Sequence, residues 1–372
     1  MIKNILITGG AGFIGAHVAR ELLAHGYSVR ALDSLVPQVH GPDRRRPDYL
    51  PAEVHLTVGD VRDPEAVVRA VRGVDAVIHL ASLVGVGQSM YQIVEYTSVN
   101  NDGTAVLLEN LSARPVEKLI VASSMSIYGE GSYMDEDGNS RQGYDRSLEQ
   151  LKSGDWELHD AAGRPLIPVP TCETKAPSLA SVYALSKFDQ ERLCLMLGRA
   201  YGIPAVALRF FNTYGPDQAL SNPYTGVLSN FASRVLNGNP PLIFEDGLQK
   251  RDFVSVYDVA RACRLALESP AAAGHALNIS SGVAMTVREI AERTVKAIGA
   301  PGIEPRITGD YRAGDIRHCF ADISLAKQLL GWEPVVTLEH GLEDLAQWLE
   351  SQTSVDRGVE ARAELAARGL LV

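Results

Sequence analysis

Short apolar runs alternate with longer amphipathic stretches through the first half of the chain. The runs are rich in Val, Ile and Leu, which is typical of buried strands. They predict strands at Ile2–Thr8, Ser28–Leu32, Val54–Val58, Ala76–Leu80, Lys118–Ala122 and Ala205–Arg209. Helical periodicity is found at Phe13–His25, Pro64–Val71, Met90–Leu111 and Ser181–Tyr201. This alternation predicts a parallel sheet covered by helices on both faces, and such sheets bind ligands at the carboxyl ends of their strands.

Beyond the sixth strand the alternation ends. Isolated strands are predicted at Leu242–Phe244, Phe253–Val256 and Ala276–Ile279, among helices and connections rich in Gly, Pro and Asn. We therefore predict an α/β protein with a Rossmann-like, doubly wound parallel sheet and a smaller, discontinuous α/β substrate-binding lobe. The expected divisions are 1–211 with 253–283 for the sheet domain, 212–252 with 284–350 for the lobe, and 351–372 for a C-terminal tail.

Two segments do not fit this scheme. Residues 130–172 are polar and lack clear periodicity, and so long an irregular stretch inside a compact domain is usually functional or mobile. We expect this inserted segment to border the ligand pocket, with a surface excursion or a subunit contact as the alternative. The tail from Val355 has the pattern of an exposed terminal helix.

Composition and charge exclude several classes of protein. Of the 372 residues, 46% are apolar and 22% charged, which excludes a disordered or fibrous chain. The net charge of −10 provides no basic field for nucleic acid or an anionic membrane. Four scattered cysteines lack the spacing of a zinc site or a disulfide framework, and no apolar stretch reaches membrane length. We expect a cytoplasmic protein with no metal site and no nucleic-acid or membrane partner.

The loop after the first strand has the form of a phosphate-binding turn. Gly9, Gly12 and Gly15 lie in TGGAGFIG, which ends a strand and opens a helix. Their expected roles are a tight turn, close approach of the backbone to a pyrophosphate, and close packing of helix on sheet. Asp33 ends the second strand, where a carboxylate would accept from both ribose hydroxyls and repel a 2′-phosphate. The pattern predicts NAD rather than NADP, and the alternative is a purely structural turn.

Two further strand ends are expected beside the same cofactor. Gly59-Asp60-Val61 follows the third strand and could present Asp60 to an adenine amine. Leu80-Ala81-Ser82 follows the fourth and is small enough for the backbone to run along the cofactor. We interpret His79, just before it, as a hydrogen-bonded histidine of the sheet rather than as a base.

The chemical centre is predicted at the start of the long helix. Tyr183 and Lys187 are four residues apart and therefore share a helical face. A nearby ammonium stabilises a phenolate and lowers the pKa of the tyrosine, which suits a general acid and base. Ser124 ends the fifth strand, where its hydroxyl can share a proton between a sugar hydroxyl and the tyrosine. In isolation the pair would more often be a core tyrosine and a surface lysine, but the glycine loop reverses that balance.

Together these motifs resemble the extended short-chain dehydrogenase/reductases, and among them the NAD-dependent nucleotide-sugar epimerases and dehydratases. The resemblance covers roughly residues 1–350 apart from 130–172. It implies a tightly held NAD that oxidises a sugar carbon to a ketone and then returns the hydride. Tyr183 would be the base, Lys187 would hold the cofactor ribose, and Ser124 would assist. The implied cofactor contacts are Gly9, Gly12, Phe13, Ile14, Gly15, Asp33, Asp60, Val61, Leu80, Ala81, Ser82, Asn100, Tyr183 and Lys187. For Asn100 the resemblance leaves open whether it is structural or near the cofactor.

The resemblance also assigns residues to a sugar nucleotide. Ser124 and Ser126 are expected at the sugar, and Asn212, in RFFNTYGP, at the diphosphate. Arg251 in KRDFV and Arg312 in RAGD would supply guanidiniums to the two phosphates, with Asp315 near the nucleoside ribose. The alternative for either arginine is a surface ion pair.

The residues after Ser124 favour epimerisation. Family dehydratases carry an Asp–Glu pair there and decarboxylases usually a Glu, where this chain has Met125 and Ser126. An epimerase needs one base, a hydride store and room to turn the keto-sugar over, so we expect inversion at C4. The alternatives are a decarboxylase or oxidoreductase on a UDP-uronic acid, with Arg164 or Arg317 at its carboxylate, and a non-catalytic NAD-sensing protein.

A finer resemblance concerns substrate and assembly. LVGVGQSMYQIVEYTSVN, SSMSIYGEG and PTCETKAPSLASVYALSK are similar to the corresponding stretches of dTDP-L-rhamnose 4-epimerases. This implies a dTDP-6-deoxyhexose as substrate and a role in deoxysugar biosynthesis. The family commonly forms dimers through two helices per subunit, which here would be Met90–Leu111 and Val182–Tyr201.

Overall fold

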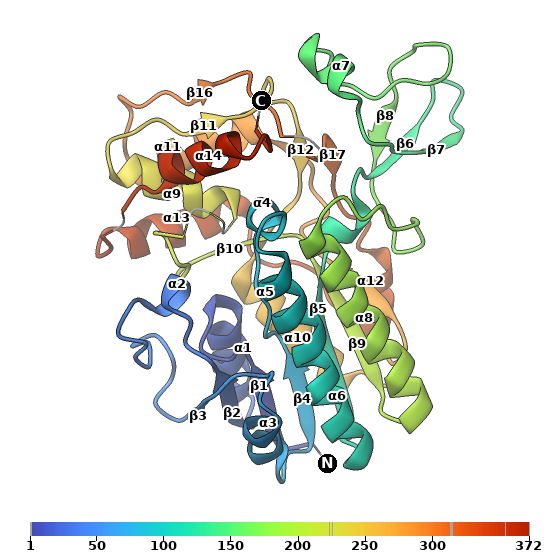
Figure 1. Ribbon diagram of the computed structural model, residues 1–372, viewed down its shortest axis with the longest axis vertical. Coiled ribbons are helices and arrows are strands. Elements are labelled where there is room, and N and C mark those ends of the chain that lie inside the picture. Colours follow the sequence, from blue (N-terminus) through green and yellow to red (C-terminus); the bar gives the residue numbers. More distant parts are fainter. Residues whose placement is uncertain (1, 223, 225, 313–314, 354, 372) are drawn as a thin grey trace.

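The computed structural model describes residues 2–222, 224, 226–312, 315–353 and 355–371. A sheet of seven parallel strands, in the order β14-β9-β5-β4-β1-β2-β3, forms the larger domain (Figure 1). The strands are β1 (Asn4–Thr8), β2 (Ser28–Asp33), β3 (His55–Val58), β4 (Ala76–His79), β5 (Lys118–Ser124), β9 (Ala205–Phe210) and β14 (Ala276–Ile279). Because β1 pairs with both β2 and β4, the chain order reverses beside it, and ligands of such sheets bind at that point. The predicted doubly wound α/β fold is confirmed.

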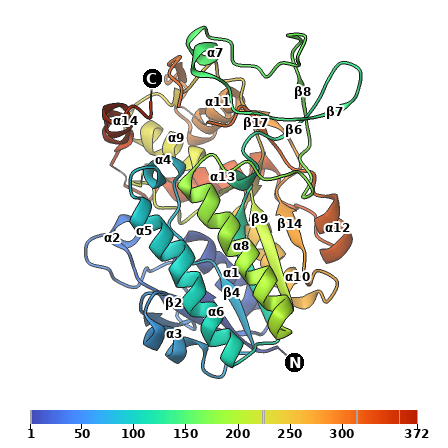
Figure 2. The ribbon, with the colours of Figure 1, turned by 45° about the vertical axis from the view of Figure 1, so that its right-hand side comes forward.

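Helices cover both faces of this sheet (Figures 1 and 2). On one face α1 (Phe13–Ala24) packs on α10 (Val256–Glu268), and α12 (Ser324–Leu330) contacts α10 and β14. The other face carries α3 (Pro64–Val71), α5 (Ile93–Thr97), α6 (Gly103–Ala113) and α8 (Val182–Tyr201). The helix predicted at Met90–Leu111 begins later and is not uniform, because a π-helical turn at Ser98–Asp102 separates α5 from α6.

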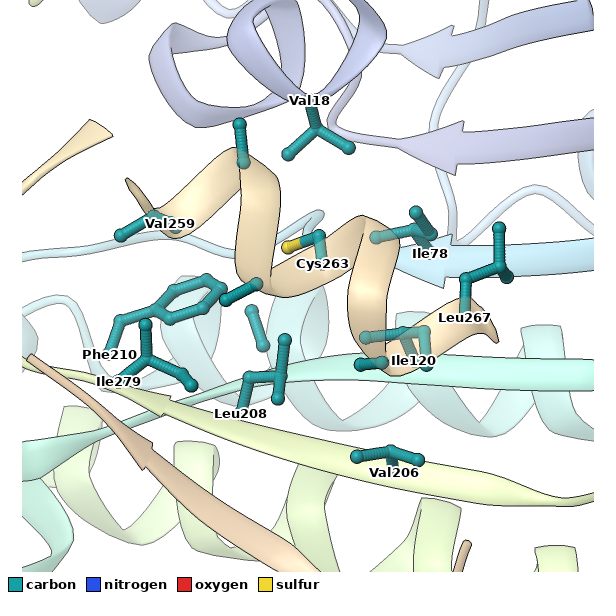
Figure 3. Close-up of a cluster of buried hydrophobic side chains, with 14 of the residues drawn as sticks. Val18, Ile78, Ile120, Val206, Leu208, Phe210, Val259, Cys263, Leu267 and Ile279 are labelled. Atoms are coloured by element: carbon teal, nitrogen blue, oxygen red, sulfur yellow. The ribbon is translucent and has the colours of Figure 1, made fainter. Parts of the chain in front are cut away.

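The main core lies between the sheet and the α1/α10 pair (Figure 3). Val259, Cys263 and Leu267 recur every fourth residue of α10, so they share one face, and that face is buried. They meet Val18 of α1 and side chains from four strands, namely Ile78, Ile120, Val206, Leu208, Phe210 and Ile279. The apolar periodicity of the first half thus has a direct counterpart in the packed core.

The smaller lobe lies beyond the carboxyl ends of the strands, at the top of Figure 1. Its helices are α9 (Val227–Leu236), α11 (Val287–Ile298) and α13 (Leu338–Leu349). Its short strands are β10 (Asn212–Tyr214) with β13 (Phe253–Ser255), β11 (Leu242–Ile243) with β16 (Arg306–Ile307), and β12 (Lys250–Arg251) between β15 (Met285–Thr286) and β17 (His318–Cys319). The lobe has a core of its own, which includes Phe231, Ile290 and Leu345.

The inserted segment, residues 130–172, is folded rather than irregular. It forms an antiparallel sheet of β6 (Ser132–Met134), β7 (Ser140–Gln142) and β8 (Ile167–Val169). The short helix α7 (Leu148–Lys152) lies between β7 and β8 in the chain, and both sheet and helix are visible in Figure 2. Tyr133, Leu158 and Leu166 are its small core. Strands of three residues are too short to show a periodicity of two, which explains why the sequence predicted none.

Buried ion pairs attach the inserted segment to the smaller lobe. Arg146 and Arg317 bind the two carboxylate oxygens of Glu245 at 2.7 and 2.9 Å, and all three side chains are at most 2% exposed. Arg317 also pairs with Glu157 of the segment at 2.6 Å and with Asp246 at 2.7 Å. The segment is therefore held by desolvated charges as well as by its own small core.

The C-terminal tail differs from its prediction. Its helix, α14 (Gly358–Ala367), was expected to be exposed, but Ala361 and Leu365 are only 8% and 6% exposed. One face of α14 therefore packs against the rest of the protein. No helix of the described residues is both long and apolar enough to cross a membrane.

Candidate active site

A cavity of about 690 Å³ runs from the carboxyl ends of the strands into the smaller lobe. Its wall combines the glycine loop, the ends of β2 to β5, the start of α8 and parts of α9, β11 and β12. It brings together the predicted residues Gly9, Gly12, Phe13, Ile14, Gly15, Asp33, Asp60, Val61, Leu80, Ala81, Ser82, Ser124, Ser126, Tyr183, Lys187, Asn212, Arg251, Arg312 and Asp315. Of the predicted site residues, only Asn100 is missing from this wall.

The glycine loop has the shape that a dinucleotide requires. Gly9 has φ +70°, and a Cβ there would lie 2.8 Å from the Ala81 nitrogen. A Cβ on Gly15 would overlap the Gly9 carbonyl oxygen, so both positions exclude side chains. A Cβ on Gly12 would approach only that same oxygen, at 3.4 Å, and α1 begins next to it without a side-chain cap. The uncapped amides of a 12-residue helix are thus available to a pyrophosphate, and the loop fits NAD.

Two carboxylates are fixed at the dinucleotide end of the cavity. Asp33 accepts hydrogen bonds from the Ala11 nitrogen at 3.0 Å and the Leu35 nitrogen at 2.9 Å. Asp60 accepts from the guanidinium of Arg62 at 2.7 and 3.0 Å, and these bonds hold the pKa of Asp60 below its usual range. Each acid is therefore held in place at a strand end and available to a ribose or an adenine.

Replacing Asp33 by Ala is expected to weaken NAD binding by about ten-fold or more, because the ribose hydroxyls lose a charged acceptor. Titration calorimetry of cofactor-stripped protein measures the change. Asp43→Ala, at a carboxylate whose side chain is 68% exposed, is the matched control and should bind NAD normally. Unchanged affinity of the Asp33 variant would remove the ribose assignment.

Asn100 is buried behind the cavity rather than in its wall. It lies in the π-helical turn, and its side-chain oxygen accepts from the Leu83 nitrogen at 2.7 Å. Its amide donates to Ser186 Oγ at 2.9 Å. Of the two roles left open for Asn100, the structure supports the structural one: it joins the loop after β4 to α8, and the π-turn gives its amide that position.

His79 is a hydrogen-bonded histidine of the sheet, as interpreted from the sequence. Its ring nitrogens lie 2.7 Å from Thr8 Oγ1 and 2.9 Å from Thr104 Oγ1. Burial, together with the charge of Lys187, lowers the pKa of His79 to about 3. The ring is therefore neutral and enclosed at physiological pH.

Tyr183 and Ser124 meet in the middle of the cavity. Ser181 caps α8 by accepting from the Ala184 nitrogen, which places Tyr183 in the first turn of the helix. The Tyr183 nitrogen donates to Ser89 Oγ at 3.0 Å. Burial raises the pKa of Tyr183 above 10, and its hydrogen bond with Ser124 acts in the opposite direction. Ser126 Oγ donates to Ser124 Oγ at 3.0 Å, so Ser124 links the phenol to a second hydroxyl.

Lys187 lies one helical turn beyond Tyr183 in α8 and is buried. Its ammonium donates to Gln190 Oε1 at 2.7 Å, and burial lowers the pKa of Lys187 to about 7. Gln190 was not predicted, although a polar residue three positions after Lys187 on a buried helical face was a usable signal. Its amide donates to Thr104 Oγ1 at 2.8 Å, so Gln190 links Lys187 to the start of α6.

Removing the Gln190 acceptor is expected to shift the pH dependence of kcat. Gln190→Leu no longer stabilises the ammonium, so the pKa of Lys187 falls further. The high-pH limb of the activity profile, where Lys187 loses its proton, therefore moves to lower pH. Gln190→Glu has the opposite sign, because a carboxylate favours the charged lysine. The pH profiles of the two variants should lie on either side of that of the unmodified enzyme. Coincident profiles would contradict this role.

Two arginines face the cavity from separate elements of the smaller lobe. Arg251 is held by the carbonyl oxygens of Arg317, at 2.9 Å, and Ile316. Arg312 donates to Asp315 at 2.9 and 3.1 Å and stacks over the Phe244 ring, which was not predicted to take part. Burial raises the pKa of Asp315, but both arginines lower it, and the net shift is downward. Arg312 thus forms an ion pair, the alternative considered for it, yet both partners line the cavity.

Asn212 stands at the turn between these groups and the sheet. Its amide donates to the Asp252 carbonyl oxygen at 2.8 Å, and the residue lines the cavity. The inserted segment contributes none of the described wall residues, so the expectation that it borders the pocket is wrong. It lies behind the wall instead, where Arg146 donates to the Asp315 carbonyl oxygen at 3.1 Å. The described side chains include no cluster of three or more His, Cys, Asp or Glu suited to a metal ion.

Comparison with known proteins also indicates an NAD-dependent enzyme that acts on nucleotide sugars. The NAD dependent epimerase/dehydratase family matches residues 5–148 and 160–280. The dTDP-L-rhamnose 4-epimerase of Burkholderia thailandensis is 34% identical over 354 residues, covering 94% of this chain and 96% of the relative. The structure of a UDP-glucose 4-epimerase from Thermotoga maritima with UDP-glucose is 30% identical, covers 93% of this chain and 98% of its own, and has a TM-score of 0.76. That of Thermus thermophilus UDP-glucose 4-epimerase with NAD is 30% identical, covers 94% and 100%, and has a TM-score of 0.74.

The matches extend over both the glycine loop and the Tyr183–Lys187 pair, and the cavity fits the dinucleotide that this family uses. The predicted resemblance and the predicted cofactor, NAD, are confirmed. The chain belongs to the NAD-dependent epimerase/dehydratase family, as an epimerase that uses NAD.

Proposed function

We propose that this enzyme inverts C4 of a nucleotide-diphosphate sugar, and that the sugar is a 6-deoxyhexose carried on dTDP, such as dTDP-L-rhamnose. One observation carries the proposal. The phenol of Tyr183, hydrogen-bonded to Ser124, shares a cavity with two guanidiniums. A proton-transfer group and a site for two phosphates in one cavity suit a reaction on the sugar of a sugar nucleotide.

Tyr183 takes the proton of the C4 hydroxyl in this mechanism and gives it back after the sugar has turned. Ser124 holds that hydroxyl, and Lys187 stabilises the phenolate. The glycine loop and Asp33 would hold NAD, which when bound would supply the two-electron chemistry at C4. Arg251 and Arg312 hold the diphosphate, so the nucleotide stays in place while the sugar rotates.

The arrangement of arginines favours epimerisation over chemistry on a uronic acid. Arg317 is 1% exposed and is occupied by Glu157, Glu245 and Asp246. Arg164 pairs with Asp160 at 2.7 Å on the surface of the inserted segment. Neither lines the cavity, so neither can recognise a sugar carboxylate there.

Two observations support a dTDP-6-deoxyhexose. The relative with 34% identity over 94% of the chain acts, by its name, on dTDP-L-rhamnose. The cavity wall also carries Val84, Val86 and Met125, whose apolar surface suits the C6 methyl group better than a C6 hydroxyl.

We also propose a cytoplasmic homodimer, formed through the face that carries α5, α6 and α8. These helices lie side by side in both ribbon views (Figures 1 and 2). Val94 is 80% exposed, and Leu185 and Met196 are also exposed on this face. Covering such apolar side chains favours association.

The test is a panel of dTDP-L-rhamnose, dTDP-glucose, UDP-galactose and UDP-glucuronic acid, each incubated with the enzyme without added NAD. Products are followed by NMR. The proposal predicts C4 inversion without net NADH, with the highest kcat/KM for dTDP-L-rhamnose. A preference for a UDP-hexose would overturn the substrate, and release of carbon dioxide would overturn the reaction.

A further inference from the structure

The helix α14 presents one face to the cavity. Gly358, Ala361, Arg362 and Leu365 line it, at positions i, i+3, i+4 and i+7 of the helix. This spacing places them on a single face. The C-terminal tail therefore forms part of the wall of the active-site cavity.

The polar edge of α14 joins loops from the two lobes. The carboxylate of Glu364 accepts from Tyr91 Oη at 2.9 Å and from Tyr224 Oη at 2.7 Å. Tyr91 follows α4 (Val86–Ser89) in the sheet domain, whereas Tyr224 precedes α9 in the smaller lobe. The two hydrogen bonds keep the pKa of Glu364 low, so it is charged at neutral pH, and Arg368 stacks 4.2 Å from the Tyr91 ring.

The apolar face of α14 supports the segment next to the catalytic tyrosine. A Cβ on Gly87 of α4 would lie 3.2 Å from Leu365 Cδ2, so the two helices are in close contact. Two residues further on, Ser89 accepts from the Tyr183 nitrogen. Contacts therefore run from α14 through α4 to the first turn of α8, and these three helices can be followed in Figure 1.

The remaining contacts of the tail fix it to the smaller lobe. Asp356 accepts from Arg234 at 3.0 Å and from Asn239 at 3.1 Å, and Arg362 pairs with Asp310. Leu371 forms a backbone bridge with Arg312, one of the two arginines at the diphosphate end. The tail thus reaches from one end of the substrate site to the other.

We propose that the tail, Asp356 to Leu371, retains the keto-sugar between the two halves of the reaction. This inference rests on the proposed C4 inversion. When the C4–H bond breaks, its hydrogen and electron pair pass to the cofactor and the hydroxyl proton passes to Tyr183. The ketone must turn over without leaving the site, because its escape would leave the enzyme with a reduced cofactor and no ketone to accept the hydride. A wall anchored to both lobes, with a largely apolar inner face, prevents escape without gripping the turning ring.

Leu365→Ala removes the contact of α14 with Gly87, and Glu364→Ala removes its hydrogen bonds with Tyr91 and Tyr224. Glu360→Ala, at an exposed position of the same helix, is the matched control. Three quantities are measured: dTDP affinity by calorimetry, KM, and free keto-sugar trapped with a carbonyl reagent while absorbance at 340 nm rises. For both wall variants we expect about a ten-fold rise in KM and weaker dTDP binding. We also expect trapped ketone and growing absorbance. The control should behave as the unmodified enzyme.

A chain ending at Glu350 extends the test to the whole tail. Its melting temperature and bound NAD show whether it folds, and a folded truncation should release more ketone than either point variant. Wall variants with unchanged dTDP affinity, unchanged KM and no trapped ketone would overturn the inference. If the unmodified enzyme inverts no sugar of the panel, the proposed function fails instead, and dTDP affinity still tests whether the tail is a wall of the site.

Discussion

Tyr183→Phe is expected to lower the rate of epimerisation by about 10³-fold, within the range contributed by a positioned acid and base. The substitution removes only the phenolic oxygen, which is hydrogen-bonded to Ser124 in the middle of the cavity. Binding should survive, because the glycine loop, Asp33 and the two arginines are untouched. The loss should therefore fall on kcat, with KM and NAD affinity close to those of the unmodified enzyme. Steady-state kinetics measures kcat and KM, and calorimetry measures NAD affinity.

Tyr201→Phe at the far end of α8 is the control for this experiment. Its ring is 49% exposed and lies outside the cavity wall, so full activity is expected. A Tyr183→Phe enzyme that keeps more than about a tenth of its activity would rule out the assigned base. It would also reopen the possibility of a protein that senses NAD without catalysis.

Arg317→Met is expected to lower the free energy of unfolding by about 3 kcal/mol, at the lower end for a broken buried ion pair. Glu245 is 2% exposed and would lose one of its two guanidiniums, while keeping Arg146. Glu157 and Asp246 are 37% and 30% exposed, so water can replace their lost partner. Urea unfolding followed by tryptophan fluorescence suits the measurement, since Trp156 lies in the inserted segment.

Arg141→Met provides the comparison within the same segment. Its side chain is 50% exposed, and its partner Asp135 keeps hydrogen bonds from the Asp137 and Asn139 nitrogens at 3.1 and 2.8 Å. The expected loss is therefore about 0–1 kcal/mol. Equal losses for the two variants would mean that the buried network does not hold the inserted segment on the lobe.

The sheet domain could be predicted because its signals are local. The helix Pro64–Val71 and the strand Ala276–Ile279 were predicted with the boundaries that the structure shows. Strand, glycine turn and helix follow one another within the first 24 residues, so the dinucleotide-binding loop can be identified from the local sequence alone. Tyr183 and Lys187 were found for the same reason, since one turn of one helix relates them.

The parts that were missed depend on contacts between distant residues. Arg317 meets Glu157 across 160 positions, and Tyr91 meets Glu364 across 273. The local sequence around each of these residues contains no pattern that predicts its distant partner. The tail was predicted to be exposed because α14 buries little more than Ala361 and Leu365, too few positions to mark an inner face. The burial that lowers the pKa of Lys187 also depends on distant residues, and it does not show in a sequence motif.

The central claim is that C4 is oxidised and then reduced again within one closed site. A dTDP-L-rhamnose deuterated at C4, incubated with the enzyme in ordinary water without added cofactor, tests it most directly. The account predicts that NMR will find the deuterium still on C4 of the inverted sugar, because the hydrogen leaves and returns through the same bound NAD. Inversion with loss of the label to water, or a product not inverted at C4, would contradict it.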